Sequence, residues 1–381
     1  MLLVAIIVSL SFYSSAFASV STKTVTVFGN PPVPPKPLNR TENIHWLRKC
    51  GLWKDKQLET TKMLGGRPAK NGEWPSAIAF TLMEANTDDH AQNQKGVAWC
   101  TGTLISSRHI ITAAHCFYVN QEDPTTRLSD CDKGLPTDIM KIGYKYQAHF
   151  HPLGLDDVTT AAAKVKPIMV KQTYVPQKFT VCDQKRANKP YYDIAVAELE
   201  SDVSLAAFEA GHVATMCVGW PRGVEKDHFD TYGYGYDPMA SVEYSTLSTE
   251  SIRADANLCK SGFSGLTSDS ICVAENKAAG CKGDSGGPII VSDRSETHNF
   301  NAQRFAVGVL SGGTECDHLA KSNMTESVGA TYTTVHDYVT NGWICSVTGL
   351  CGDPFEVGQV PEENSVKKEN RNNEQKVYKF D

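Results

Sequence analysis

The sequence lacks an excess of basic residues, long apolar stretches beyond its N-terminus and any strong helical signal. Its 37 basic and 43 acidic residues give a formal net charge of −6, which excludes a basic nucleic-acid-binding protein. Only 21% of the 381 residues are charged and 41% are hydrophobic, so a highly charged disordered chain is excluded as well. We find no internal repeat and no glycine-rich phosphate-binding loop. The apolar content suffices for one large domain or two moderate ones.

Cysteine, by contrast, is abundant: the chain has twelve, an even number that predicts six disulfides in an oxidising compartment. Residues 2–8 are continuously apolar, and Ala16-Phe17-Ala18 is a small-x-small cleavage site. We therefore predict a signal peptide over residues 1–18, although no Lys or Arg precedes the apolar run. The alternatives are a membrane anchor and a buried strand, but the run is too short to span a bilayer and no later segment is apolar enough. We expect a secreted, extracellular protein without a membrane partner.

The two ends of the chain differ in composition from its middle. Residues 19–62 contain a proline-rich stretch that favours polyproline II, together with Cys50 and a glycosylation sequon at Asn39. Residues 353–381 are rich in Glu, Lys and Asn, and we interpret them as a disordered charged tail rather than a solvated helix. A second sequon lies at Asn323, in a polar stretch.

The middle of the chain has a β-like pattern. Short apolar runs are separated by Gly, Asp, Asn and Ser, a spacing that predicts an all-β sandwich or barrel. Helical periodicity is best over residues 333–344, where Val335, Tyr338, Val339 and Trp343 share one face. We therefore expect a β domain that ends in a C-terminal helix.

Three short segments contribute a histidine, an aspartate and a serine. His115 follows a predicted hairpin, Asp193 opens an apolar strand, and Ser285 lies among the glycines of the segment 283–287. A serine hydroxyl becomes a nucleophile when an imidazole takes its proton, and the imidazole needs a carboxylate that fixes its tautomer. Backbone N–H groups next to glycine can stabilise the developing oxyanion, and Gly283 and Ser285 are placed to offer them.

These segments closely resemble those of the chymotrypsin/trypsin-like serine peptidases. The matching motifs, in the family's order, are Thr112-Ala113-Ala114-His115-Cys116, Asp193-Ile194-Ala195 and Gly283-Asp284-Ser285-Gly286-Gly287-Pro288. The resemblance implies a peptidase domain over residues 63–352, built of two six-stranded antiparallel β-barrels with the active site between them. It further implies that Ser285 is the nucleophile, His115 the general base and acid, and Asp193 the orienting carboxylate, with the oxyanion hole at Gly283 and Ser285.

The resemblance also implies that the protein is a zymogen. The segment Met63-Leu64-Gly65-Gly66 is similar to the family's mature N-terminus, so that residues 19–62 would be a propeptide. Cleavage after Lys62 would free the α-amine of Met63, which the resemblance pairs with buried Asp284. The implied partners are a trypsin-like activating protease, protein or peptide substrates and a protein inhibitor, and no cofactor is needed.

The resemblance implies three disulfide bridges, and a fourth bridge would tie the propeptide to the peptidase domain. The first three are Cys100–Cys116, Cys259–Cys272 and Cys281–Cys316, and the fourth is Cys50–Cys217. We pair the remaining four cysteines as Cys131–Cys182 and Cys345–Cys351. Cross-pairing among these four stays open on the sequence alone.

The resemblance places the floor of the substrate pocket six residues before Ser285, at Ala279. The pocket walls would be formed by Ser311, Gly312, Gly313 and Ala330. Because the floor carries no carboxylate, burying a cationic side chain there would be costly, and we expect cleavage after apolar residues.

Two other interpretations stay open. A catalytically inactive homologue could bind partners through the long insertion at residues 117–192, although such homologues usually lose the histidine or the serine. An esterase is less well supported, because the glycines and the activation sequence are typical of peptidases. We predict no metal site, since His149 and His151 have no cysteine or carboxylate at metal-ligand spacing.

Overall fold

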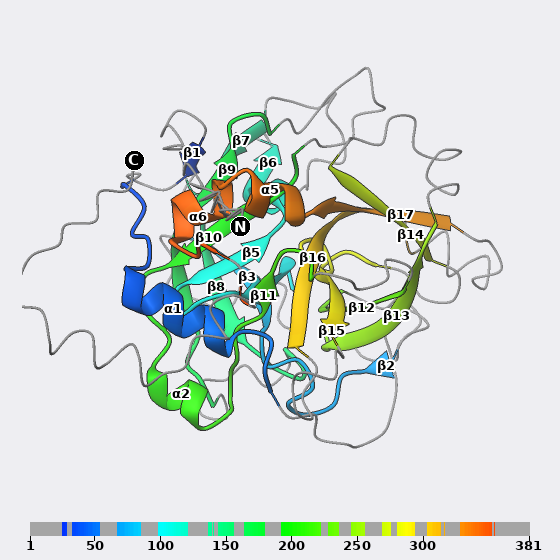
Figure 1. Cartoon of the computed structure of the whole chain (residues 1–381). Helices are drawn as coiled ribbons and strands as arrows, with labels where there is room; N and C mark the ends of the chain where they lie inside the picture. The colour runs from blue at the N-terminus through cyan, green and yellow to red at the C-terminus, as the bar shows by residue number, and fades with distance from the viewer. Residues whose placement is uncertain are drawn as a thin grey trace, which may run out of the picture.

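Figure 1 shows the computed structural model of the whole chain. The structure describes residues 25–28, 33–53, 67–84, 98–120, 136–138, 140, 144–155, 164–179, 192–221, 228–235, 245–255, 269–275, 280–293, 303–313, 316, 328–352 and 354. In these residues, no helix is both long enough and apolar enough to span a membrane.

The first of two closed β-barrels contains six strands in the order β9-β10-β5-β4-β3-β8, and β8 pairs with β9 to close the ring (Figure 1). Every pair in this ring is antiparallel. The strands are β3 (Ala77–Glu84), β4 (Cys100–Leu104), β5 (His109–Thr112), β8 (Tyr144–Phe150), β9 (Ile168–Pro176) and β10 (Ala195–Leu199). A further strand, β1 (Val25–Phe28), pairs with residues 173–176 of β9, beyond the part of β9 that pairs with β8. Large buried side chains such as Phe80, Phe117 and Tyr146 fill the barrel.

The second barrel is also a closed antiparallel ring, in the order β16-β15-β12-β13-β14-β17, with β17 pairing back to β16. Its strands are β12 (His228–Gly233), β13 (Ser248–Ala254), β14 (Ser270–Glu275), β15 (Pro288–Asp293), β16 (Gln303–Gly312) and β17 (Val328–Thr334). Two short strands extend it: β2 (Arg67–Pro68) pairs with β13, and β11 (Cys217–Val218) runs parallel to β16. A separate two-stranded antiparallel sheet consists of β6 (Tyr118–Asn120) and β7 (Pro136–Asp138). The predicted fold of two six-stranded barrels is confirmed.

The predicted C-terminal helix exists, but it begins later than the sequence pattern suggested and is divided in two. Strand β17 continues to Thr334, and the helical part consists of α5 (His336–Thr340) and α6 (Trp343–Thr348). Gly342 interrupts the helix because it adopts a left-handed conformation, with φ of 78°. The apolar face expected for this segment is buried nonetheless, as Tyr338 and Trp343 are both in the core.

The N-terminal segment contains a helix that the sequence analysis did not predict. This helix, α1 (Arg40–Lys49), begins with a capping box: the Oδ1 atom of Asn39 accepts from the N–H of Glu42, and the carboxylate of Glu42 accepts from the N–H of Asn39. Its side chains Trp46 and Leu47 are buried in one apolar cluster with residues of α6. Residues 40–53 of this segment are therefore a folded part of the body.

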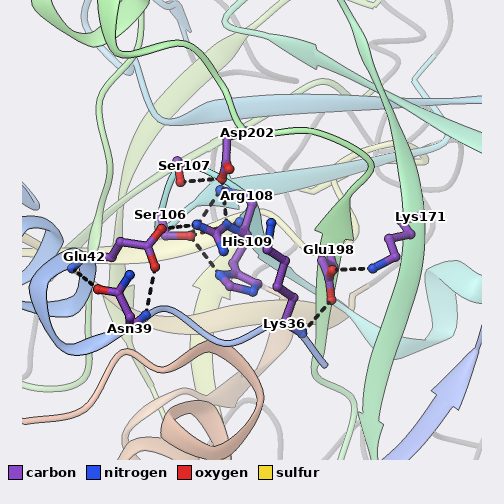
Figure 2. Close-up of polar contacts among 10 residues, drawn as sticks. All are labelled: Lys36, Asn39, Glu42, Ser106, Ser107, Arg108, His109, Lys171, Glu198 and Asp202. Atoms are coloured by element: carbon purple, nitrogen blue, oxygen red, sulfur yellow. Dashed lines mark hydrogen bonds and ion pairs between the residues drawn. The ribbon is translucent and has the colours of Figure 1, made fainter. Parts of the chain in front are cut away.

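Figure 2 shows the polar contacts that join this segment to the first barrel. Arg108, which is buried, binds the carboxylate of Glu42 from α1 and, through its Nε atom, Oδ1 of Asp202 at 2.6 Å. The backbone N–H of Lys36 approaches Oε2 of buried Glu198 at 3.4 Å. The N-terminal segment thus supplies charge and hydrogen-bond partners to groups that the barrel buries.

Four of the predicted disulfides are present among the described residues. They are Cys50–Cys217, Cys100–Cys116, Cys281–Cys316 and Cys345–Cys351. Cys272 is also in a disulfide, and its predicted partner Cys259 lies outside the described residues, as do Cys131 and Cys182. The predicted signal peptide, nearly all of the predicted tail and the sequon at Asn323 lie outside them too.

Candidate active site

Strands β5 and β10 bring His115 and Asp193 together. The two strands pair antiparallel with Ala195 opposite Thr112, so the end of β5 lies beside the beginning of β10. His115 follows β5 on the short 3₁₀ helix η2 (Ala114–Phe117), and Asp193 lies just before β10. The Nδ1 atom of His115 is 2.7 Å from Oδ2 of Asp193, and the backbone N–H of His115 donates to Oδ1 at 2.8 Å.

The carboxylate of Asp193 fixes the imidazole in one tautomer. A carboxylate only accepts hydrogen bonds, so Nδ1 of His115 carries the hydrogen and Nε2 is left as the basic nitrogen. The side chain of Asp193 is 1% exposed, whereas that of His115 is 20% exposed, so the outer ring edge stays accessible. The hydroxyl of Ser311, at the end of β16, donates a third hydrogen bond to Asp193, at 2.6 Å. The second barrel therefore helps to hold the aspartate of the first.

Ser285 lies in a tight turn that precedes β15. Gly283 and Gly286 on either side of it have left-handed backbone angles, with φ of 107° and 83°. Any side chain at Gly286 would overlap the hydroxyl of Thr112 and the carbonyl of Thr101. The carbonyl of Ser285 accepts a hydrogen bond of 2.8 Å from the N–H of Thr101 in β4. Glycine thus lets the turn approach the first barrel closely.

Asp284 points into the protein rather than towards solvent. Its Oδ1 atom accepts from the N–H of Gly235 at 2.5 Å, and its Oδ2 atom accepts from the N–H of Cys281 at 2.7 Å. The side chain is buried, and a side chain at either Gly233 or Gly235 would collide with it. The buried carboxylate therefore anchors the turn that carries Ser285. Lys62 and Met63, the other two residues of the predicted activation switch, lie outside the described residues.

Two backbone donors of this turn have no protein acceptor among the described residues. Within the described part of the chain, neither the N–H of Gly283 nor that of Ser285 donates to another protein group. The side chains of Ser285 and His115, both described, are not hydrogen-bonded to each other. Such contacts are often long in ligand-free enzymes and shorten when substrate binds. The arrangement offers two donors, a base and a hydroxyl, which is the set that acyl transfer needs.

The predicted pocket residues are only partly described. Ser311 and Gly312 end β16, and Gly313 follows them. Ala330 is fully buried in β17, whereas Ala279 lies outside the described residues. The Oγ1 atom of Thr331 donates to the carbonyl of Gly312 at 3.1 Å, which ties the two predicted walls together.

The barrels, the His115–Asp193 pair and the glycine-framed serine agree with a comparison of protein families. The sequence profile of one family, named Trypsin, matches residues 63–339. The chain belongs to the trypsin family. All three motifs that carried the resemblance lie within the matched range.

Curated relatives of this trypsin-family chain include proteases of different sizes. The human protein named Mannan-binding lectin serine protease 1 is 26% identical over 311 residues, which cover 79% of this chain and 38% of the relative. The Venom protease of Bombus pensylvanicus is 25% identical over 268 residues, which cover 67% of this chain and 89% of the relative. The chain thus spans well under half of the first relative's length.

A solved structure in the comparison is neuropsin, a serine protease expressed in the limbic system of mouse brain. It is 20% identical, with a TM-score of 0.48 over 74% of this chain and 98% of the neuropsin chain.

Two residues at the site were not assigned their observed contacts by the sequence analysis. Ser311 was expected only as a pocket wall, yet its hydroxyl binds Asp193. Thr101 was given no role by the sequence analysis, yet it contacts the turn that carries Ser285. Neither contact has a local sequence signal, because each joins residues more than 100 positions apart.

Proposed function

We propose that this protein is a secreted serine endopeptidase that hydrolyses peptide bonds through an acyl-enzyme on Ser285. The observation that carries the proposal is the buried Asp193 carboxylate, which holds Nδ1 of His115 and leaves Nε2 available as a base. Membership of the trypsin family supports the reaction class.

In the first half of the proposed reaction, Oγ of Ser285 attacks the carbonyl carbon of the scissile peptide while Nε2 of His115 takes the hydroxyl proton. The carbonyl oxygen gains the negative charge, and the N–H groups of Gly283 and Ser285 donate to it. Collapse of this intermediate breaks the C–N bond, and His115 gives its proton to the leaving amine. Asp193 stays ionised throughout and stabilises the imidazolium.

In the second half, water replaces the amine. His115 takes a proton from water, the hydroxide attacks the ester carbonyl, and the same two N–H groups bind the second oxyanion. The C–O bond to Ser285 then breaks, the serine oxygen recovers its proton from His115, and the carboxylic acid product leaves. The enzyme returns to its starting state without a cofactor.

The proposal includes synthesis as a zymogen. Cleavage after Lys62 by a trypsin-like protease would create an ammonium group at Met63, and that group would pair with the carboxylate of Asp284. Burial of Asp284 beside Ser285 supports this pairing, because a buried carboxylate needs an opposite charge to offset its lost hydration. The disulfide Cys50–Cys217 would keep residues 19–62 attached after the cut. N-terminal sequencing of the active form should find Met63 at the new terminus.

Specificity and processing are also part of the proposal. We expect cleavage after apolar residues, because Ala279 at the pocket floor brings no carboxylate for a cationic side chain. We expect signal cleavage after Ala18 and glycosylation at Asn39 and Asn323. Asn39 is exposed, and its capping bond uses Oδ1 rather than the Nδ2 atom that a glycan modifies.

Limited trypsin treatment followed by labelling tests the proposal. The treated wild-type chain should react with a peptidyl organophosphonate at Ser285 and cleave a positional peptide library, preferring apolar residues before the cut. The matched control is Ser285→Ala, which should do neither. Treated wild-type protein that is cut after Lys62 yet stays unlabelled would favour the alternative of an inactive binding homologue. A strong preference for Arg or Lys would overturn the specificity part alone.

A further inference from the structure

Thr101 connects the first barrel to the turn that carries Ser285. It lies in β4 next to Cys100, and its side chain is completely buried. All of its backbone and side-chain polar groups have partners: its N–H donates to the carbonyl of Ser285 at 2.8 Å, and its carbonyl accepts from Oγ1 of Thr112 at 2.7 Å.

The hydroxyl of Thr101 bridges two loops of the second barrel. It donates to the carbonyl of Gly283 at 2.7 Å and accepts from the N–H of Tyr234 at 3.0 Å. The residue after Tyr234, Gly235, in turn donates its N–H to Asp284 at 2.5 Å. One hydroxyl of the first barrel therefore ties the turn of Ser285 to the neighbouring loop that holds Asp284.

We propose that Thr101 is a positioning residue for the oxyanion hole, an inference that rests on the proposed peptidase function. The backbone of Gly283 has little steric restriction, so its angles need an external restraint if the N–H groups of Gly283 and Ser285 are to point at one spot. Thr101 supplies that restraint at two points, because it fixes the carbonyl of Gly283 with its hydroxyl and that of Ser285 with its N–H. The N–H of Ser285 lies between these two fixed carbonyls.

The side chain, rather than only the backbone of β4, is the testable part. Valine has nearly the shape of threonine but no hydroxyl, so Thr101→Val keeps the bond from the backbone N–H to Ser285. It leaves the carbonyl of Gly283 and the N–H of Tyr234 without their shared partner. Donors that are misaligned by even a small distance stabilise an oxyanion poorly.

Strand β4 offers a matched control two residues away on the same face of the strand. Thr103 is also fully buried, and its hydroxyl bonds the phenol of Tyr232 at 2.8 Å rather than the turn of Ser285. Thr103→Val therefore removes a buried hydroxyl from the same strand without touching the oxyanion loop.

The experiment compares trypsin-activated wild-type, Thr101→Val, Thr101→Ser and Thr103→Val full-length chains. The phosphonate reaction is first run to completion, and the molecules labelled at Ser285 are counted as active sites. The turnover of a peptide ester and of a peptide amide is then divided by this count, so that misfolded protein does not lower the measured kcat. For Thr101→Val we expect kcat to fall about 10- to 100-fold with KM changed less than about twofold, since the loss is confined to the transition state. Thr101→Ser, which restores the hydroxyl, should lie within about threefold of wild type, as should Thr103→Val.

A second readout measures the oxyanion hole directly. A peptide boronate forms a tetrahedral adduct that uses these donors, whereas a cleaved peptide product does not. Thr101→Val should weaken the boronate about 10-fold or more and leave product inhibition unchanged. If Thr101→Val does not fold, Thr101→Ala takes its place in both measurements.

The outcomes separate the two claims. A wild-type chain that neither labels nor turns over overturns the proposed function, and this inference with it. If the wild-type chain is active, three results for Thr101→Val overturn the inference alone. The variant keeps its kcat, its KM rises by as large a factor as its kcat falls, or it behaves like Thr103→Val. The same holds if Thr101→Ser is as impaired as Thr101→Val.

Discussion

Single glycines decide how closely the serine-bearing turn can approach the first barrel. Gly286 has a left-handed φ of 83°, and a Cβ atom there would overlap backbone and side-chain atoms of Thr101 and Thr112. Gly211 has a similar φ of 68°, but a Cβ atom at that position meets nothing within 4 Å. An alanine at Gly211 would therefore add only backbone strain, whereas an alanine at Gly286 would add the same strain and a steric collision.

We predict that Gly286→Ala lowers the free energy of unfolding by about 2 kcal/mol or more beyond the effect of Gly211→Ala. The control should cost only about 1–2 kcal/mol, the strain of a left-handed alanine. Denaturant unfolding of both variants measures the difference. Equal losses in the two variants would mean that the turn can move away from Thr112 and that the close approach is not required.

Asp193 illustrates how one residue serves a neighbour rather than the substrate. Its carboxylate accepts three hydrogen bonds, from Nδ1 of His115, from the backbone N–H of His115 and from the hydroxyl of Ser311. In Asp193→Asn the amide can present N–H towards Nδ1, which favours the wrong tautomer. We predict a fall in kcat of about 10⁴-fold with little change in KM, a loss of the size typical of this substitution in the family. A loss below tenfold on peptide substrates would contradict the assigned role.

At the scale of elements, α1 is part of the core although it precedes the residues that match the trypsin family. Trp46 is buried against residues of α6 and contacts Phe208 with ring centroids 4.7 Å apart. Beyond the helix, the N–H of Gly51 donates to the carbonyl of Thr215 at 2.7 Å, and its carbonyl accepts from the N–H of Arg304 at 3.1 Å. The segment is thus held by packing and backbone bonds as well as by a disulfide.

We predict that Trp46→Ala lowers the free energy of unfolding by about 3–5 kcal/mol, because it empties a large buried site. Leu52→Ala, in the same segment but 40% exposed, is the control and should change it by less than about 0.5 kcal/mol. Thermal and urea unfolding of the full chain give both values. A loss in unfolding free energy no larger than that of Leu52→Ala would show that packing of α1 does not stabilise the fold.

At the scale of the whole molecule, buried His109 and half-buried His151 make stability depend on pH. Burial lowers the pKa of His109 to about 3 and that of His151 to about 4, from an ordinary value of 6.5. Both rings already serve hydrogen bonds: Nδ1 of His109 lies 2.8 Å from the hydroxyl of Ser106, and Nε2 of His151 accepts from the N–H of Gly72 at 2.9 Å. Each is therefore neutral in the folded protein at mildly acidic pH.

The unfolded chain takes up a proton at each of these histidines below about pH 6.5, whereas the folded protein does not until much lower pH. The free energy of unfolding should therefore be greatest above about pH 6.5 and should fall as the pH drops towards 4. Melting curves across this range for wild type and His109→Gln test it, since the variant should lose part of the decline. His336→Gln, an exposed position, should keep the wild-type slope. Parallel curves for wild type and His109→Gln would contradict the assignment.

The sequence by itself determined the family and the class of fold. Motifs around His115, Asp193 and Ser285 are local, because each residue needs a particular turn or strand end beside it, and local turns leave a signature in glycine and in small residues. The alternation of short apolar runs and turn residues predicted an all-β sandwich or barrel for the same reason, and the family resemblance predicted the two six-stranded barrels. The C-terminal helix was predicted, but neither its later start at His336 nor its break at Gly342 was, since the predicted segment began within β17 and apolar periodicity continued across the glycine.

Only the tertiary structure decided how α1 packs against the barrels and which residues join the two barrels at the site. Helix α1 has polar residues around most of its surface, so its apolar periodicity does not predict that it is buried. Its burial depends on the apolar side chains that α6 and the first barrel place around Trp46 and Leu47. The contacts of Thr101 with Gly283 and of Ser311 with Asp193 join the two barrels across more than 100 residues of chain. Such contacts arise when independently specified barrels pack together, and their geometry is a property of that packing.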